Sequence, residues 1–239
     1  MISSPHNEKL KLVRKLRERK HREREGLFVT EGEDLVEAGL AAGVQPRLLL
    51  SAPGSGLGGE EVEPELLAEV SALGSGTRAI AVWPQAWADE AKPPCVYLHG
   101  VADPGNVGAI VRTAHGLLGG TVVLGPGCAD PFGPKAVRAS MGSIFAQALL
   151  RGGIYATPQP RAALVPRGGV DLEGFGRAAT ICLGAERDGL PAEVLSECDV
   201  EVTIPLRPGA AESLNVAAAA AIVCERLSSP AMQEAAEDA

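Results

Sequence analysis

Short apolar stretches typical of β-strands alternate with helix-like stretches along most of this chain. From residue 95 onward the pattern predicts strands at 95–101, 121–125, 162–166, 179–184 and 200–206, and helices at 107–119, 134–142 and 212–227. Such alternation predicts an α/β fold with a mostly parallel sheet and helices on both faces. Because ligands of these sheets bind beyond the carboxyl ends of the strands, the loops that follow strands are the expected functional sites.

The N-terminal part repeats the alternation on a smaller scale. It predicts strands at 27–30, 47–51 and 79–83, and helices at 10–25, 32–43 and 64–73. Residues 84–94 are rich in proline and charge, which is typical of a linker. We therefore expect two domains, at 1–88 and 92–229, which are sizes that ordinary domains reach.

Composition narrows the class of protein further. The 239 residues are 46% apolar but only 3% aromatic, so the core must be built mainly from Ala, Val, Leu and Ile. The chain has no apolar run long enough to cross a membrane and no secretory signal at its N-terminus. The five cysteines are scattered without metal-ligand spacing, so we expect buried reduced thiols, no metal site and a cytoplasmic protein.

Positive charge is concentrated at the N-terminus of an otherwise acidic chain. The net charge is -8, yet residues 1–28 carry nine Lys and Arg against four Glu. Such a segment can bind a phosphate backbone locally, although a solvated helix of mixed charge is the alternative. The residues that we predict to contact RNA are Lys15, Arg17, Arg19 and Lys20.

Three motifs each follow a predicted strand directly. They are DPGNVGAIVRTA at 103–114, GAERDGLP at 184–191 and IPLRPGAAESLN at 204–215. None contains the glycine pattern of a dinucleotide-binding turn or of a nucleoside-triphosphate loop, so a nicotinamide oxidoreductase is a distant alternative. Three loops at one edge of a sheet can instead converge on a single pocket.

In this order and spacing the motifs resemble those of the SpoU (TrmH) class of SPOUT RNA methyltransferases. The resemblance rests on Asn106-x-Gly108-x-x-x-Arg112, Gly184-x-Glu186-x-x-Gly189-Leu190, Ile204-Pro205 with Ser213-Leu214-Asn215-Val216-Ala217, and the stretch 129–145. The N-terminal unit is similar to the small L30e-like substrate-binding domain of many members. The resemblance therefore covers nearly the whole chain.

This resemblance implies a specific fold and reaction. The fold is a trefoil-knotted, mostly parallel α/β catalytic domain preceded by an L30e-like α/β domain, in a homodimer whose active site is near the subunit interface. The reaction transfers a methyl group from S-adenosylmethionine to a ribose 2′-hydroxyl of RNA. Ribosomal RNA is favoured over tRNA by analogy with the ribosomal-protein-like domain. A tRNA 2′-O-methyltransferase, a base methyltransferase and a catalytically silent RNA-binding protein of this fold remain alternatives.

The resemblance also implies which residues form the site. The catalytic set is Arg112, Asn106, Glu186, Ser213 and Asn215. The cofactor is expected to be held mainly by the backbone of Gly184, Ile204 and Leu214, while Leu206 in the same loop packs on the adenine. Because arginine stays protonated in proteins, Arg112 suits the stabilisation of an alkoxide or the binding of a phosphate better than the role of a base. Alternatively, Arg112 is an ordinary surface residue, while Asn106 and Ser213 cap helices.

Two stretches depart from the pattern of the family. Residues 143–183 are short and interrupted by prolines, where relatives carry a fuller helix, so one covering helix and details of the dimer are in question. The loop 207–212 is rich in Gly and Ala, where polar residues are common in relatives. Neither departure removes a residue from the predicted site.

Overall fold

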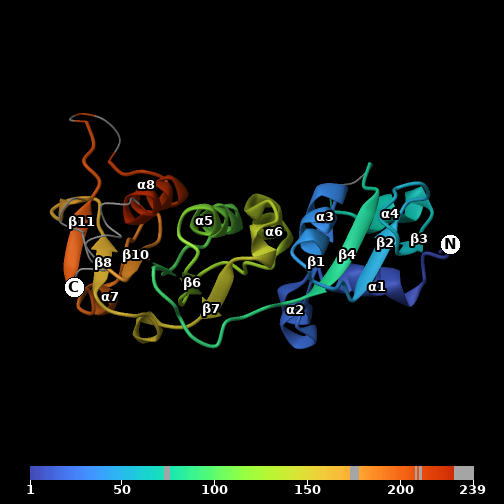
Figure 1. Ribbon diagram of the computed structural model, residues 1–239, viewed down its shortest axis with the longest axis horizontal. Coiled ribbons are helices and arrows are strands. Elements are labelled where there is room, and N and C mark those ends of the chain that lie inside the picture. The colour runs from blue at the N-terminus through green and yellow to red at the C-terminus, as the bar shows by residue number, and fades with distance from the viewer. Residues whose placement is uncertain (73–75, 173–177, 208, 210–211, 229–239) are drawn as a thin grey trace. The chain divides into compact units, whose positions relative to one another are not determined.

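The computed structural model describes residues 1–72, 76–172, 178–207, 209 and 212–228 (Figure 1). The chain forms two compact units. The N-terminal unit comprises Met1–Ala86 and Asp130–Ala146, and the C-terminal unit comprises Trp87–Ala129 and the chain from Gln147 onward. A segment that lies between two strands of the C-terminal unit thus packs into the N-terminal unit. The domain boundaries 1–88 and 92–229 stay a prediction, since structural units and sequence domains need not coincide.

The N-terminal unit is a small four-stranded sheet with helices. Its elements are α1 (Glu8–Lys15), α2 (Arg19–Glu25), β1 (Leu27–Glu31), α3 (Glu33–Ala41), β2 (Leu48–Ser51), β3 (Glu60–Glu61), α4 (Pro64–Val70), β4 (Ala79–Pro84), α6 (Pro134–Ser140) and the 3₁₀ helix η1 (Ser143–Phe145). The strand order is β1-β4-β2-β3, in which β4 is antiparallel to β1 and β2, while β2 and β3 are parallel.

The single helix predicted at 10–25 is wrong, because the chain forms two helices there. The apolar side of this stretch is as predicted, and Leu10, Val13 and Leu16 are buried. The chain leaves the helical conformation before α2, where Glu18 is extended with φ of -90° and ψ of 133°. A buried arginine that binds the carbonyl groups at the end of α1 accounts for the break, as described below.

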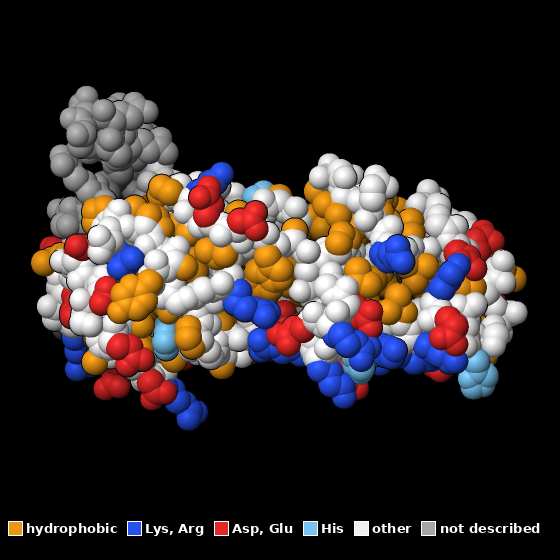
Figure 2. Space-filling model, turned by 90° about the horizontal axis from the view of Figure 1, so that it is seen from below, with side chains coloured by type: hydrophobic (Ala, Val, Ile, Leu, Met, Phe, Trp, Pro, Cys, Tyr) orange, Lys and Arg blue, Asp and Glu red, His pale blue; other side chains and the backbone are white. Residues whose placement is uncertain are grey.

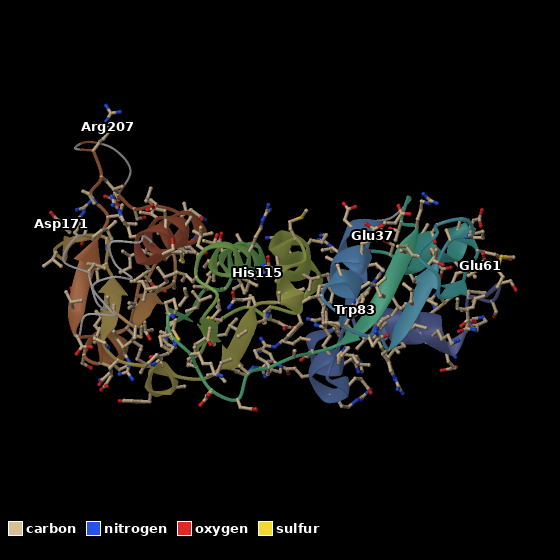
Figure 3. The ribbon with its side chains drawn as sticks, in the orientation of Figure 1. Glu37, Glu61, Trp83, His115, Asp171 and Arg207 are labelled. Carbon is tan, nitrogen blue, oxygen red and sulfur yellow. The ribbon has the colours of Figure 1, made fainter. Side chains whose placement is uncertain are left out.

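An aromatic cluster completes the core of the N-terminal unit. Phe28 on β1 packs against Phe132 and Phe145 of the segment 130–146, with ring centroids 5.0 and 5.7 Å apart. Trp83 on β4 is fully buried (Figure 3), lies 4.8 Å from the ring of Phe145, and donates a hydrogen bond to Thr30. A chain that is poor in aromatic residues therefore concentrates several of them where the inserted segment meets the sheet.

The C-terminal unit is a seven-stranded sheet with the order β7-β6-β5-β10-β8-β11-β9. Each neighbouring pair of strands is parallel, which confirms the predicted fold class. The elements are β5 (Cys95–Leu98), α5 (Pro104–Leu117), β6 (Thr121–Leu124), β7 (Ala148–Arg151), η2 (Ile154–Ala156), β8 (Arg161–Leu164), β9 (Val170–Asp171), β10 (Thr180–Leu183), α7 (Ala192–Leu195), β11 (Val200–Thr203) and α8 (Val216–Ser228).

The proline-broken stretch is built from short elements. From 143 to 172 the chain forms η1, β7, η2, β8 and β9, and this described stretch contains no α-helix. Residues 173–177 lie outside the described residues. The apolar run 144–150, which the sequence pattern leaves unassigned, divides between η1 and the edge strand β7. The trefoil knot stays a prediction.

Several expected absences can be examined in the described part of the chain. The cysteines are free; Cys95, Cys182 and Cys224 are buried, whereas Cys128 and Cys198 are only partly buried. Among the described residues there is no group of three or more His, Cys, Asp or Glu placed to hold a metal ion. No helix within these residues is both long enough and apolar enough to span a bilayer.

Candidate active site and cofactor cavity

The three sequence motifs lie at one edge of the parallel sheet. Helix α5 begins shortly after β5, the loop 184–189 follows β10, and the loop from Ile204 to Asn215 follows β11. Because all these strands run in the same direction, their carboxyl ends lie at the same edge. The loops are therefore placed to form one site within the C-terminal unit.

Helix α5 begins with a cap that leaves the Asn106 side chain available. Asp103 is the N-cap residue, and its carboxylate accepts a hydrogen bond of 3.0 Å from the backbone N–H of Asn106. Pro104 occupies the first turn, where a missing N–H costs nothing. The alternative that Asn106 itself caps the helix is therefore wrong.

Asn106 joins the other two motifs by hydrogen bonds from its amide group. Its Nδ2 donates to Oε1 of Glu186 at 2.5 Å, and its Oδ1 accepts from Nδ2 of Asn215 at 3.1 Å. One amide orientation satisfies both bonds, because a carboxylate can only accept and the Asn215 NH₂ group can only donate. Three of the predicted catalytic residues thus form one chain, Glu186–Asn106–Asn215, which we call the amide chain.

Asn215 also determines where helix α8 begins. Its Oδ1 accepts hydrogen bonds from the backbone N–H groups of Ala217 at 2.9 Å and Ala218 at 3.3 Å. Asn215 is therefore the helix cap in place of Ser213, and the helix starts at Val216 rather than at 212. Ser213 lies before the cap, where its exposed side chain lines the cavity described below.

A tight glycine-bearing loop presents Glu186. Ala185 and Gly189 exchange two backbone hydrogen bonds of 3.0 and 3.1 Å, and Gly189 has a left-handed φ of +66° that favours glycine. A Cβ at Gly184 would lie 2.2 Å from the carbonyl carbon of Gly189. The two glycines of the second motif are therefore needed for the shape of the loop that carries Glu186.

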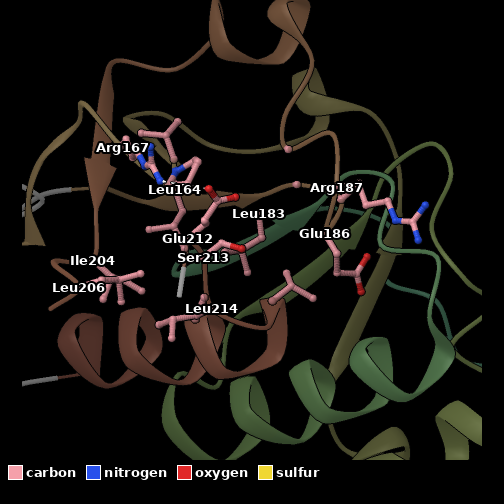
Figure 4. Close-up of a pocket in the computed structure, with 17 residues that line it drawn as sticks. Leu164, Arg167, Leu183, Glu186, Arg187, Ile204, Leu206, Glu212, Ser213 and Leu214 are labelled. Atoms are coloured by element: carbon pink, nitrogen blue, oxygen red, sulfur yellow. Dashed lines mark ion pairs between the residues drawn. The ribbon is translucent and has the colours of Figure 1, made fainter. Parts of the chain in front are cut away.

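A cavity of about 540 Å³ opens beside this loop (Figure 4). Its lining includes the four predicted cofactor-binding residues: Gly184, Ile204, Leu206 and Leu214. Glu186 and Ser213 also line it, and in Figure 4 the Glu186 side chain points from the loop toward helix α5. The cavity combines an apolar wall with backbone groups and carboxylates, as small-molecule sites commonly do.

Sequence reasoning missed a fourth loop of this cavity. Residues 164–167, at the end of β8 and just after it, form part of the lining, and Arg167 lies 3.8 Å from the carboxylate of Glu212. Both side chains are mostly exposed, so this ion pair is weak. The position directly after a strand was the available signal, because β8 ends at the same edge of the sheet as the other three strands.

Arg112 does not join the amide chain. It is exposed on α5, and in the described part of the chain its guanidinium forms no hydrogen bond or ion pair. An α-helix rises about 1.5 Å and turns about 100° per residue, so six residues place Arg112 about 9 Å along the helix and about 120° around it from Asn106. Arg112 also does not line the cavity.

The two histidines near the site have ordinary surroundings. His99 follows β5, and its Nδ1 lies 3.1 Å from the hydroxyl group of Tyr97. Burial raises the pKa of Tyr97 to about 12, so this hydroxyl keeps its proton at neutral pH. His115 is exposed near the end of α5 (Figure 3). The contact of His99 with Tyr97 does not indicate acid–base chemistry.

The four basic residues predicted to bind RNA are exposed on and between α1 and α2. Arg17 donates to the carbonyl of Val70 at 2.6 Å, Arg19 pairs with Glu23 at 2.9 Å, and Lys20 pairs with Glu18 at 2.8 Å. Figure 2 shows Lys and Arg side chains gathered over the N-terminal helices, with acidic side chains among them. Exposed pairs of this kind are weak, so phosphates can replace the carboxylates.

Two family models match the chain. The SpoU rRNA methylase family matches residues 93–225, and the MRM3-like substrate binding domain matches residues 7–87. The first match covers more than half of the chain. The protein therefore belongs to the SpoU rRNA methylase family, and the match at 7–87 shows that an N-terminal substrate-binding domain is present.

Individual relatives agree with this family, some of them over nearly the full length of the chain. The chain is 30% identical over 245 aligned residues to the 23S rRNA (guanosine(2553)-2′-O)-methyltransferase RlmP of Bacillus subtilis, covering 95% of this chain and 98% of the relative. It is 33% identical over 140 residues to the 23S rRNA (uridine(2479)-2′-O)-methyltransferase of Streptomyces viridochromogenes, covering 50% and 47%. The structure of the AdoMet-bound rRNA methyltransferase of Sinorhizobium meliloti is similar with a TM-score of 0.83 and 27% identity, covering 95% and 96%.

Proposed function

We propose that this protein transfers the methyl group of S-adenosylmethionine to a ribose 2′-hydroxyl of ribosomal RNA. The observation that carries the proposal is the amide chain at the edge of the cavity, because it joins one residue from each of three motifs. The relatives named for 23S rRNA 2′-O-methylation support the same reaction and the same class of RNA.

The cavity fits the cofactor. Its volume of about 540 Å³ lies in the range of sites for small molecules and cofactors. Ile204, Leu206 and Leu214 offer an apolar wall for the adenine ring. Gly184 has no side chain, so a ligand can approach its backbone closely. The charged side chains of the lining are two carboxylates, Glu186 and Glu212, and two guanidinium groups, Arg167 and Arg187, so groups of either sign on the ligand can meet an opposite charge. When bound, the cofactor supplies an electrophilic methyl group on a sulfonium.

The residues of the site then act on the RNA side of the reaction. The 2′-hydroxyl would have to lose its proton, which a phosphate oxygen or water would accept, as its oxygen takes the methyl group that the bound cofactor would supply. The protonated guanidinium of Arg112 stabilises the developing negative charge or binds the adjacent phosphate. The amide chain holds Asn106 and Asn215 in fixed positions relative to Glu186, which lines the cavity.

The position of Arg112 supports a homodimer. Within one chain Arg112 is separated from Asn106 along and around α5, so a site that uses both is readily completed by a second copy of the chain. We therefore propose a homodimer that acts on RNA, and we propose the cytoplasm as its location on the separate ground of its rRNA-modifying relatives. Light scattering on the purified protein should give twice the mass of one chain; a monomer that is fully active would contradict the dimer.

Calorimetric titration with S-adenosylmethionine, and then with S-adenosylhomocysteine, tests the proposed cofactor. We expect saturable binding of one molecule per chain. A folded protein that binds neither compound would be a catalytically silent RNA-binding protein of the same fold.

The class of RNA needs a separate experiment. Purified ribosomal RNA and total tRNA, each incubated with methyl-labelled cofactor, should show label in ribosomal RNA alone. Label confined to tRNA would show that tRNA is the substrate instead of ribosomal RNA. The proposed methyl transfer to a ribose would be unchanged.

A further inference from the structure

Arg22 is a buried arginine in the most highly charged helix of the chain. Its exposed fraction is only 4%, although its neighbours Arg19, Lys20 and Arg24 are exposed. Its Nη1 donates to the carbonyl oxygen of Leu16 at 2.8 Å and to that of Arg17 at 2.6 Å. These carbonyls lie just beyond the end of α1, where the last acceptors of a helix lack helical partners. The guanidinium of Arg22 therefore binds carbonyl oxygens that the N–H groups of a further helical turn would otherwise have bound.

Asp130 holds the other side of the same guanidinium. Its Oδ2 lies 2.9 Å from Nε and 2.7 Å from Nη2 of Arg22, and its Oδ1 accepts a 3.0 Å hydrogen bond from the N–H of Phe132. Asp130 is 8% exposed, so both charges are removed from water. Burying an ion pair costs desolvation energy and adds little net stability, so its main effect here is to fix geometry.

The geometry that is fixed is the turn between α1 and α2. This turn carries Arg17 and leads directly into Arg19 and Lys20, three of the predicted RNA contacts. The two carbonyl bonds hold the chain out of the helical path that its sequence otherwise favours. The positions of the exposed cations in this turn thus depend on Arg22, a buried cation that RNA cannot contact.

We propose that Arg22 is a positioning residue for RNA binding, which acts through the turn that presents Arg17, Arg19 and Lys20 to phosphates. Asp130, which belongs to the part of the chain matched by the SpoU family, is its anchor. The proposal rests on the proposed function, because it assumes that the N-terminal unit binds RNA. It makes the arrangement of the surface charges, as well as their number, a determinant of affinity.

The first test compares Arg22→Gln with Arg24→Gln in the full chain. Both remove one positive charge from α2, but Arg24 is exposed and, among the described residues, forms an ion pair only with the neighbouring Glu25. With transcribed 23S rRNA as the probe, we expect Arg22→Gln to weaken binding about tenfold. The slope of log affinity against log salt should fall by more than the contribution of one phosphate contact. Arg24→Gln should change affinity less than about twofold. A folded Arg22→Gln protein that binds like Arg24→Gln overturns the proposal.

The second test separates positioning from general stability. In a background of Arg17→Gln, Arg19→Gln and Lys20→Gln, adding Arg22→Gln should cause no further loss of RNA affinity, because the side chains through which it acts are gone. The dissociation constant for S-adenosylmethionine should stay at the wild-type value throughout. An additive further loss in this background would show that Arg22 does not act through the turn, and would overturn the proposal.

If Arg22→Gln does not fold, the RNA affinity of Asp130→Asn tests the proposal instead. This change keeps the size of the side chain and removes its charge, and we expect weaker RNA binding in the same direction with unchanged cofactor affinity. Wild-type RNA binding and salt dependence in a folded Asp130→Asn protein overturn the proposal. Failure of the wild-type protein to bind RNA at all is a different result, since it contradicts the proposed function itself.

Discussion

The loop that carries Glu186 and the turn between α1 and α2 are both held in one shape, but by opposite means. The loop depends on the absence of a side chain, because Gly184 packs directly against the backbone of Gly189. The turn depends on a long side chain, because Arg22 fills the space and binds the free carbonyls. Backbone packing leaves the side chain of the loop available for chemistry. The buried guanidinium of Arg22 instead fixes the turn that presents exposed cations to RNA.

The comparison predicts that catalysis depends on the C-terminal unit, and most strongly on Arg112. Arg112→Ala should lower the rate of methyl transfer about 100- to 1000-fold, because the positive charge that stabilises the transition state is lost. Cofactor affinity should not change, since Arg112 does not line the cavity. Single-turnover kinetics with 23S rRNA measure the rate, and Arg226→Ala on the exposed part of α8 is the matched control. Wild-type turnover in Arg112→Ala would remove this residue from the reaction.

Adding one carbon atom to the loop should strongly weaken cofactor binding. In Gly184→Ala the new methyl group would overlap the backbone of Gly189, so we expect affinity for S-adenosylmethionine to fall about 10- to 100-fold. Gly153→Ala is the control, because this glycine has φ of -81° and its added Cβ would contact nothing within 4 Å. Calorimetry measures both variants, and equal affinities would show that the loop shape does not matter.

A charge change in the amide chain should make activity depend on pH. Asn106→Asp places a second carboxylate beside Glu186 and removes the N–H donor, so the two carboxylates repel each other unless they share a proton. We expect activity about tenfold below wild type at neutral pH and a partial recovery as the pH falls and the pair takes up a proton. Asn106→Ala loses both hydrogen bonds of the side chain and should show no recovery in acid. Rate–pH profiles that are parallel for the two variants would contradict this role.

The smallest effect on the rate of methyl transfer should come from the four basic residues on and between α1 and α2. Neutralising Lys15, Arg17, Arg19 and Lys20 should weaken RNA binding and lower the slope of log affinity against log salt by about three, since each phosphate contact contributes about 0.7 to 0.9. The rate at saturating RNA should change little. Filter binding over a range of salt measures the slope, and an unchanged slope would exclude these residues from the RNA site.

Local patterns predicted the C-terminal unit well. Parallel strands followed by loops placed the motifs at one edge, and Asn106, Glu186 and Asn215 do meet there. The start of α8 could not be predicted in the same way. Ser213 and Asn215 are both favourable caps, and only the fold shows that Asn215 bonds the free N–H groups.

The N-terminal unit depends on contacts that are distant in sequence. Helical periodicity predicted one helix at 10–25, and nothing local indicates that Arg22 will meet Asp130, which lies 108 positions away. Likewise, Phe132 and Phe145 read as part of the second α/β pattern although they pack around Phe28. Such long-range pairs override helix propensity and are not visible in a single sequence.

The most direct test of the central claim is the detection of 2′-O-methyl nucleosides in RNA. Unmethylated 23S rRNA would be incubated with the purified protein and S-adenosylmethionine, then digested to nucleosides and measured by mass spectrometry. We predict one new ribose-methylated nucleoside that depends on the cofactor and is missing with Arg112→Ala. Methylation of a base instead of a ribose, or no methylation by a protein that binds both cofactor and RNA, would contradict the proposed reaction.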